Sequence, residues 1–171
     1  MKKVAAAGMF LLVVGWGHTV TGLAASVDAL AVLKVSGNAL RFSNTIIPSH
    51  GLRAGRVPAS THIAAGLVLG NRAFNELTLK WDRIINPALP GEGASVALLR
   101  ASEGKPGVAV RLVMLAPEKT DTIVDDLEND QVRYRFSLRT GEAYGINVLH
   151  DGEILVPGIY RIAVAADILA A

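Results

Sequence analysis

Apolar residues recur at every second position along most of this chain, and this period limits its fold more than any other feature. In one run, for example, Leu77, Leu79 and Trp81 alternate with Thr78 and Lys80. A period of two is that of a β-strand with one buried face, whereas an amphipathic helix has a period of about 3.6 residues. Clusters of glycine, proline, asparagine and aspartate separate the runs. Many short strands with frequent turn signals predict an all-β sandwich or barrel.

The runs that we expect to form strands are residues 26–35, 40–46, 62–69, 77–81, 95–99, 108–115, 133–139, 146–149, 154–156 and 160–168. Asp151-Gly152 lies between two of these runs, and Asp-Gly between apolar runs predicts a β-hairpin. The acidic residues 121–130 interrupt the pattern, and they predict either a short helix or a solvated loop.

The N-terminus has the three parts of a secretory signal peptide. Lys2 and Lys3 are followed by an apolar run at residues 4–14, and Gly22 and Ala24 suit the −3 and −1 positions of a cleavage site. We therefore expect residues 1–25 to be a signal peptide that is cleaved after Ala24 or Ala25. A retained membrane anchor is the alternative, because no charge interrupts residues 4–25. Several glycine and threonine residues dilute the second half of that span, which favours cleavage.

Removal of the leader changes the charge balance of the chain. The sequence has 17 basic and 15 acidic residues, and Lys2 and Lys3 both belong to the leader, which leaves 15 of each. A balanced mature chain gives no reason to expect nucleic acid or an anionic membrane surface as a partner. The chain also has no cysteine. The mature domain must therefore be held together by packing and sheet hydrogen bonds, although many small secreted domains use disulfides.

The sequence contains no recognisable catalytic, cofactor or metal motif. It lacks a Gly-x-Ser-x-Gly elbow and a His-Glu-x-x-His helix. His50 and His150 fall in predicted turns, His62 begins a predicted strand, and His18 belongs to the leader. The acidic residues 121–130 do not have the spacing of a calcium-binding EF-hand loop. We predict that the protein is not an enzyme and has no cofactor.

Three arginines share one face of a predicted strand: Arg133, Arg135 and Arg139. They could bind an anionic glycan or keep a sheet edge soluble, and we expect the second.

A strand-like segment follows the leader directly and precedes the first strand of the domain. It begins at Ser26 and continues to about residue 36. It could be an ordinary first strand, and the spacing of Val27, Leu30 and Lys34 also fits an amphipathic helix. A third interpretation is a strand meant for another molecule, because an unpaired strand edge invites association.

Two segments of the chain resemble a known family. Residues 45–56 read Thr-Ile-Ile-Pro-Ser-His-Gly-Leu-Arg-Ala-Gly-Arg, and Pro58-Ala59-Ser60 follows. This stretch resembles the Saf-type pilin subunits of the chaperone–usher fimbrial family, in the FGL chaperone class. The ending from Pro157 to about residue 164 is similar to the last strand of the same group.

The resemblance implies an immunoglobulin-like β-sandwich at residues 37–171 that lacks its last strand. A donor strand from a chaperone or a neighbouring subunit would complete the sandwich, and residues 26–36 would be the donor-strand extension. The implied donor residues are Val27, Ala29, Ala31, Leu33 and Val35. The implied acceptor groove consists of Leu40, Phe42, Ile46, Tyr160, Ile162, Val164, Ala166 and Ile168.

The resemblance also implies a function and a set of partners. The chain would be a structural pilin that is exported through the periplasm and polymerises into a surface fibre by donor-strand exchange, with a contribution to adhesion. Its partners would be a periplasmic chaperone, an outer-membrane usher, identical subunits and, for an adhesin, a host-cell receptor. The alternatives are a tip adhesin of the same system and a monomeric secreted β-sandwich that binds a ligand or carbohydrate.

Overall fold

The computed structural model describes residues 25–31, 41–103 and 108–170, so the predicted signal peptide lies outside the described residues except for Ala25. The regular structure of these ranges is strand, which confirms the predicted all-β class. The strands are β1 (Ala25–Ala31), β2 (Phe42–Pro48), β3 (Gly55–Val57), β4 (His62–Trp81), β5 (Val96–Glu103), β6 (Ala109–Leu115), β7 (Thr122–Asp126), β8 (Gln131–Val148), β9 (Glu153–Leu155) and β10 (Gly158–Ala170). None of the described residues forms a helix long and apolar enough to cross a membrane.

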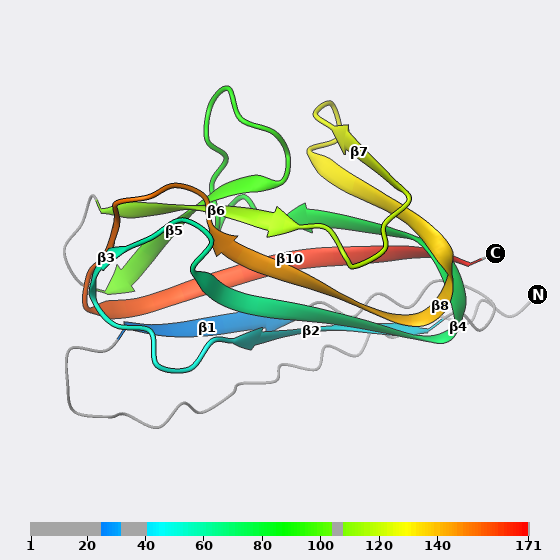
Figure 1. Cartoon of the computed structure of the whole chain (residues 1–171), viewed down its shortest axis with the longest axis horizontal. Helices are drawn as coiled ribbons and strands as arrows, with labels where there is room; N and C mark the ends of the chain where they lie inside the picture. Colours follow the sequence, from blue (N-terminus) through cyan, green and yellow to red (C-terminus); the bar gives the residue numbers. More distant parts are fainter. Residues whose placement is uncertain (1–24, 32–40, 104–107, 171) are drawn as a thin grey trace, which may run out of the picture.

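The long strands β4 and β8 organise the sandwich. They pair with each other in antiparallel fashion, and the remaining edge of β4 pairs with β2 along its first half and with β10 along its second half. The main hydrogen-bonded order is β1-β10-β5-β6-β8-β4-β2, with β7 added to β8, and β3 and β9 form a separate pair. Strands β1, β2 and β10 lie along one side of the molecule (Figure 1).

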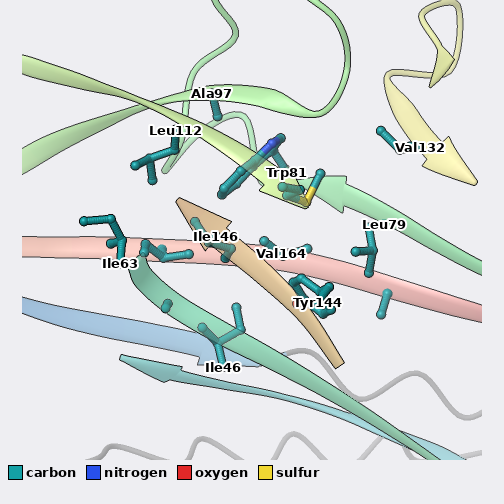
Figure 2. Packing of buried hydrophobic residues seen from close by; sticks show 14 of the residues in the cluster. Ile46, Ile63, Leu79, Trp81, Ala97, Leu112, Val132, Tyr144, Ile146 and Val164 are labelled. Carbon is teal, nitrogen blue, oxygen red and sulfur yellow. The ribbon is translucent and has the colours of Figure 1, made fainter. Parts of the chain in front are cut away.

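The alternating apolar side chains form one continuous core between the strands (Figure 2). Its largest fully buried side chains include Trp81, Tyr134, Tyr160 and Phe74. The indole of Trp81 also needs a polar partner, and its Nε1 donates a hydrogen bond of 2.9 Å to the backbone oxygen of Ser95. The core therefore joins strands from both ends of the chain without any disulfide.

Strand β4 is longer than the sequence pattern predicts. Residues 62–69 and 77–81 were expected to be separate strands with a turn at Gly70, and that division was wrong. The pairing of β4 with β8 shifts register between Leu69 and Phe74. An irregular stretch of this kind absorbs turn-forming residues and bends a strand without ending it. The same strand can therefore pair with β2 before the bend and with β10 after it.

Strand β8 requires two similar corrections. Residues 133–139 and 146–149 belong to this one strand, although they were predicted as two. The predicted hairpin at Asp151-Gly152 was also wrong: the turn forms, with Gly152 at φ +78°, but the strands on either side do not pair with each other. Strand β9 pairs with β3, because both edges at the end of β8 are already paired, with β4 and with β6.

The acidic residues 121–130 are neither a helix nor only a loop. They contain strand β7, which pairs with the start of β8, and a tight turn that ends at Asp130 in a left-handed conformation (φ 54°). Within the turn, the carboxylate of Asp126 accepts hydrogen bonds from the backbone and side-chain nitrogens of Asn129 at 3.1 and 3.0 Å. These bonds lower the pKa of Asp126 below its usual value. The acidic composition of this stretch therefore concealed a strand that pairs with β8.

A glycine and a tyrosine fit together across β4 and β8. Gly66 is the register partner of Tyr144, and a Cβ added at Gly66 would lie 1.9 Å from the Cζ atom of the Tyr144 ring. The ring therefore lies across β4 at Gly66, a position that has no side chain. This arrangement allows the hydroxyl of Tyr144 to reach past β4 toward β2.

We predict that Gly66→Ala lowers the free energy of unfolding by about 3 kcal/mol, because the ring of Tyr144 must leave its place in a closely packed core. Urea unfolding followed by tryptophan fluorescence measures this change. Gly145→Ala is the matched control, since a Cβ there would meet Leu115 at an ordinary 3.4 Å. Equal losses in the two variants would contradict the proposed fit of Tyr144 over Gly66.

Candidate functional site

The first described segment of the chain pairs with the last strand. Strand β1 runs parallel to β10 along its whole length, with Val27 opposite Tyr160, Ala29 opposite Ile162 and Ala31 opposite Val164. Strand β1 also lies beside β2, so that it occupies the space between β10 and β2 (Figure 1). We call this space between β2 and β10 the strand-accepting cleft.

The structure brings part of the predicted donor set and most of the predicted groove together. Val27, Ala29 and Ala31 belong to β1, whereas Leu33 and Val35 lie outside the described residues. Leu40 of the predicted groove also lies outside them. The other groove residues are buried members of the single core cluster: Phe42, Ile46, Tyr160, Ile162, Val164, Ala166 and Ile168.

One edge of β10 is satisfied by loop residues just after β4 ends. The backbone oxygen of Ala163 accepts a hydrogen bond of 2.9 Å from the Asp82 backbone nitrogen. Asn86 is fully buried, and its side chain accepts a bond of 2.8 Å from the backbone nitrogen of Ala163 and donates one of 3.0 Å to the oxygen of Arg161. Asn86 thus replaces a strand at this edge. The sequence indicated only a turn at Asn86-Pro87.

The opposite edge of β10 faces the strand-accepting cleft. Amide groups of successive residues in a strand point to opposite sides, so those of Val164 point away from Asn86 and toward β1 and β2. On that side the oxygen of Val164 accepts a hydrogen bond of 2.9 Å from Nδ2 of Asn44. Oδ1 of Asn44 accepts a second bond, of 3.1 Å, from the hydroxyl of Tyr144. Asn44 is only 3% exposed.

Asn44 is not among the site residues predicted from the sequence, although the sequence contains a signal for it. Asn44 lies midway between Phe42 and Ile46, which are two predicted core positions of the same strand. A polar residue on the buried face of a strand needs a partner in the core and is therefore a reason to expect a specific contact.

The start of β10 is fixed by a tyrosine corner. The hydroxyl of Tyr160 accepts a hydrogen bond of 2.9 Å from the backbone nitrogen of Val156 and donates one of 2.8 Å to its oxygen. Similar corners occur in immunoglobulin-like sandwiches, where a tyrosine holds the chain that enters a strand. This corner fixes the end of β10 against which β1 begins to pair.

The structure tests the predicted absence of catalytic and metal motifs only in part. His50 and His150 lie in turns, and His62 opens β4, where its Nδ1 lies 3.0 Å from Oδ1 of Asn147. In the part of the chain that the structure describes, no three histidine or acidic side chains gather closely enough to hold a metal ion.

The three arginines of β8 all have intramolecular partners. Arg135 binds Glu76 at 2.7 Å and Arg133 binds Asp126 at 3.4 Å. Arg139 pairs with Glu142 and also donates hydrogen bonds to backbone oxygens of the β6–β7 loop. Their charges are therefore balanced within the fold, which supports the expected structural role over binding of an anionic glycan.

A surface hollow of about 560 Å³ lies between the β4–β5 loop and the turn after β7. Three of its charged side chains have partners within the fold, and one of them, Asp125, accepts a hydrogen bond of 3.0 Å from the backbone nitrogen of Ala94. Arg83 makes a bidentate pair with Asp130 at 2.5 and 2.7 Å and also donates hydrogen bonds to two backbone oxygens. This pairing holds the pKa of Asp130 below its usual value. The hollow therefore joins two loops, and its side chains Arg83, Asp125 and Asp130 are engaged within the fold.

Comparison with known proteins places the fold among fimbrial subunits. The Hda pilus minor tip subunit HdaB of Escherichia coli superposes with a TM-score of 0.60 and 14% identity, over 76% of this chain and 84% of that one. The Salmonella SafD adhesin gives 0.61 and 16%, over 75% and 84%. AggB, the minor subunit of aggregative adherence fimbriae type I from Escherichia coli, gives 0.55 and 11%, over 75% and 85%.

No protein-family model and no curated protein matches the sequence. The structural comparisons nevertheless show that the chain has the immunoglobulin-like fold of chaperone–usher fimbrial subunits. The resemblance to Saf-type pilins that two sequence segments suggested is confirmed at the level of the fold.

We predict that the protein loses stability above pH 10, because burial raises the pKa values of Tyr144 and Tyr160 above their usual 10.0. A phenol that ionises at a higher pH in the folded chain than in the unfolded chain contributes stability below pH 10. This contribution is lost as the pH rises further, by about 1.4 kcal/mol per pH unit for each buried tyrosine.

Urea unfolding at pH 8, 10 and 11 tests this dependence, with Tyr144→Phe as the comparison. The variant should be less stable at pH 8 by about 1 kcal/mol, because it lacks the bond to Asn44. It should also lose less stability between pH 10 and pH 11. An identical alkaline slope in both proteins would contradict the assignment to Tyr144.

Proposed function

We propose that this protein is a structural subunit of a bacterial surface fibre, and that it assembles by exchange of the N-terminal strand between neighbouring copies. The observation that carries the proposal is the pairing of β1 with the cleft-facing edge of β10. Residues 25–31, the first that the structure describes, form that ladder, and residues 32–40 separate them from the next described residue. The same segment of another copy would make the same main-chain hydrogen bonds in the same cleft.

The chemistry of the cleft suits an exchanged strand. A strand added to a sheet edge gains affinity from main-chain hydrogen bonds and specificity from alternate side-chain positions. In the β1 register, every second position from Val27 onward pairs with a buried residue of β10. Exchange of an identical strand between copies also requires no new interface, because each copy uses the contacts that already exist within the monomer.

The fold comparisons and the leader support a chaperone–usher route. The neighbours HdaB and AggB are described as minor subunits of a pilus and of fimbriae, and SafD is described as an adhesin. A signal peptide would deliver the chain to the periplasm. There a chaperone would cover the cleft until an usher passes the subunit to the growing fibre. The products of such a route lie on the cell surface.

The pairing of β1 with β10 also favours a second candidate function. Because β1 pairs with β10 of its own chain, the protein could complete its own sandwich as a secreted monomer. A tip adhesin, which ends a fibre, is a closer variant, in keeping with the names of HdaB and SafD. Whether copies of the protein assemble into a fibre distinguishes these two possibilities from the proposed structural subunit.

We predict that Ala29→Asp abolishes fibre formation. Ala29 pairs with Ile162, which is fully buried, and an added charge at that position would have to be desolvated without a partner. Cells that make the full chain with an FGL-class chaperone and usher should lose the heat-sensitive, SDS-resistant ladders of subunits. The chaperone-bound subunit should still form, because the chaperone supplies its own strand.

Ser26→Asp is the matched control, since it adds the same charge at the position paired with the partly exposed Ile159. This variant should keep the ladders. The proposal is wrong if the parent chain is a stable monomer that needs no chaperone, or if Ala29→Asp assembles as well as the parent.

A further inference from the structure

We propose that the outer face of strands β2, β4, β8 and β6 is a contact surface for a second copy of this chain, separate from the strand-accepting cleft. The inference does not rest on the proposed strand exchange. It starts from the first half of β4, where residues 63–70 carry no polar side chain. A strand that is covered on both faces has a continuous apolar sequence of this kind, whereas a strand with one face in water alternates.

The second half of β4 shows the contrast within the same strand. Leu77 and Leu79 are fully buried, and Thr78 and Lys80 face outward between them and beyond. This half has the alternation of a strand with one face in water. The first half therefore has the composition of a strand covered on both faces, although only its inner face is covered within the chain.

Strand β8 changes in the same way along its length. Arg133 and Arg135 occupy outward positions in its first half, whereas the outward positions of its second half are Gly141, Ala143 and Gly145. The second half of β8 pairs with the first half of β4. The two uncharged stretches thus lie side by side in the sheet.

The strand register arranges this surface, which we call the outer apolar face, in three rows across the sheet. The rows are Ser43–Leu69–Gly141, Thr45–Leu67–Ala143 and Ile47–Ala65–Gly145–Leu115. None of these ten residues is charged, and none of them is fully buried. Two identical faces that meet bring like groups together, so a charged face would repel its own copy. This face has no such repulsion.

The large side chains of the face lie along it. Leu69 covers Gly141, where an added Cβ would lie 2.7 Å from Cδ2 of the leucine, and Leu115 covers Gly145 at 3.4 Å. Ile47, Leu69 and Leu115 nevertheless remain 50%, 48% and 42% exposed. Exposed apolar surface that is shared by neighbouring strands is typical of an interaction site.

The sizes of the side chains point to a second copy as the occupant. In a two-fold contact the same face meets itself. An axis that crosses the strands along the middle row, Thr45–Leu67–Ala143, places each outer row over the other. Leu69 then lies opposite Ala65, and Ile47 lies opposite Ser43. Large side chains meet small ones, as the facing sheets of a sandwich do.

Leu115 also has a complementary position in this arrangement. Strand β6 ends at Leu115, and a hollow of about 470 Å³ lies next to it, between β8 and the β6–β7 loop. The apolar part of its lining includes Ala116 and Ala143. The same two-fold axis turns Leu115 of the second copy toward this hollow. A lipid surface would need no such match between raised and hollow parts of the face.

Sedimentation velocity tests the contact with protein purified after expression of the full chain. At concentrations from about 1 μM to about 1 mM, a range that includes weak association, the parent should form a reversible dimer. Ala143→Glu should raise the Kd of this dimer roughly tenfold or more, because the middle row places the two new charges opposite each other.

Ala165→Glu is the matched control. Ala165 is also exposed, but it pairs with Lys80 in the charged half of β4 and lies outside the outer apolar face. This variant should keep the Kd of the parent. Should Ala143→Glu fail to fold, Thr45→Glu adds the same charge to the middle row from β2, and the same rise of the Kd is expected.

A cross-linking experiment locates the contact. The chain has no cysteine of its own, so Ala143→Cys supplies a single thiol on the proposed axis. A short bis-maleimide should link two copies of this variant, and it should not link copies of Ala165→Cys. Without the cross-linker, the dimer should dissociate in SDS at room temperature, unlike the SDS-resistant ladders expected from strand exchange.

A parent chain that stays monomeric up to about 1 mM and does not cross-link through Ala143→Cys would overturn the proposal. Equal association of the parent and Ala143→Glu would place the contact elsewhere and overturn it as well. A monomeric parent that floats with phosphatidylcholine vesicles, when Ala143→Glu does not, would assign the face to a lipid surface instead of a second copy. None of these outcomes affects strand exchange, which the SDS-resistant ladders report separately.

Discussion

The backbone of β10 is the constraint on which this structure depends. A strand in the interior of a sandwich must find partners for its amide groups on both edges, because buried unpaired groups are costly. On one edge, β10 obtains them from parts of the fold that are fixed in place, namely β4, Asp82 and Asn86. On the other edge, much of the pairing comes from β1, which lies at the far end of the chain. The two edges therefore differ in how readily their partners can be replaced.

Two buried asparagines bind the backbone of β10, one on each of its edges. Asn86 continues the β4 edge after β4 has ended, and Asn44 donates a hydrogen bond to the oxygen of Val164 on the opposite edge. A side-chain amide can do this because it has the same donor and acceptor groups as a peptide but ends at a defined point. Each asparagine is fully engaged, so its burial adds specificity without leaving a polar group unsatisfied.

The sequence predicted the class of fold and the positions of most strands because alternation reports burial on one face, and that pattern is local. It did not predict that β4 and β8 each continue through a turn-like stretch, because register shifts at residues such as Phe74 depend on the partner strand. The partner of β9 and the role of Asn44 were missed for a similar reason. Both depend on contacts between residues distant in sequence, which periodicity does not describe.

The strand exchange proposed above requires a driving force from outside the cleft. An identical strand from a neighbouring copy restores the same hydrogen bonds. The contacts in the cleft therefore provide little net free energy for exchange. The chain's own strand also competes at an effective concentration on the order of millimolar, whereas a second copy must lose translational freedom to bind. Assembly is therefore favoured when each subunit arrives with its cleft already filled by a strand that is not its own. A chaperone that donates such a strand would remove the competition before the next subunit is met.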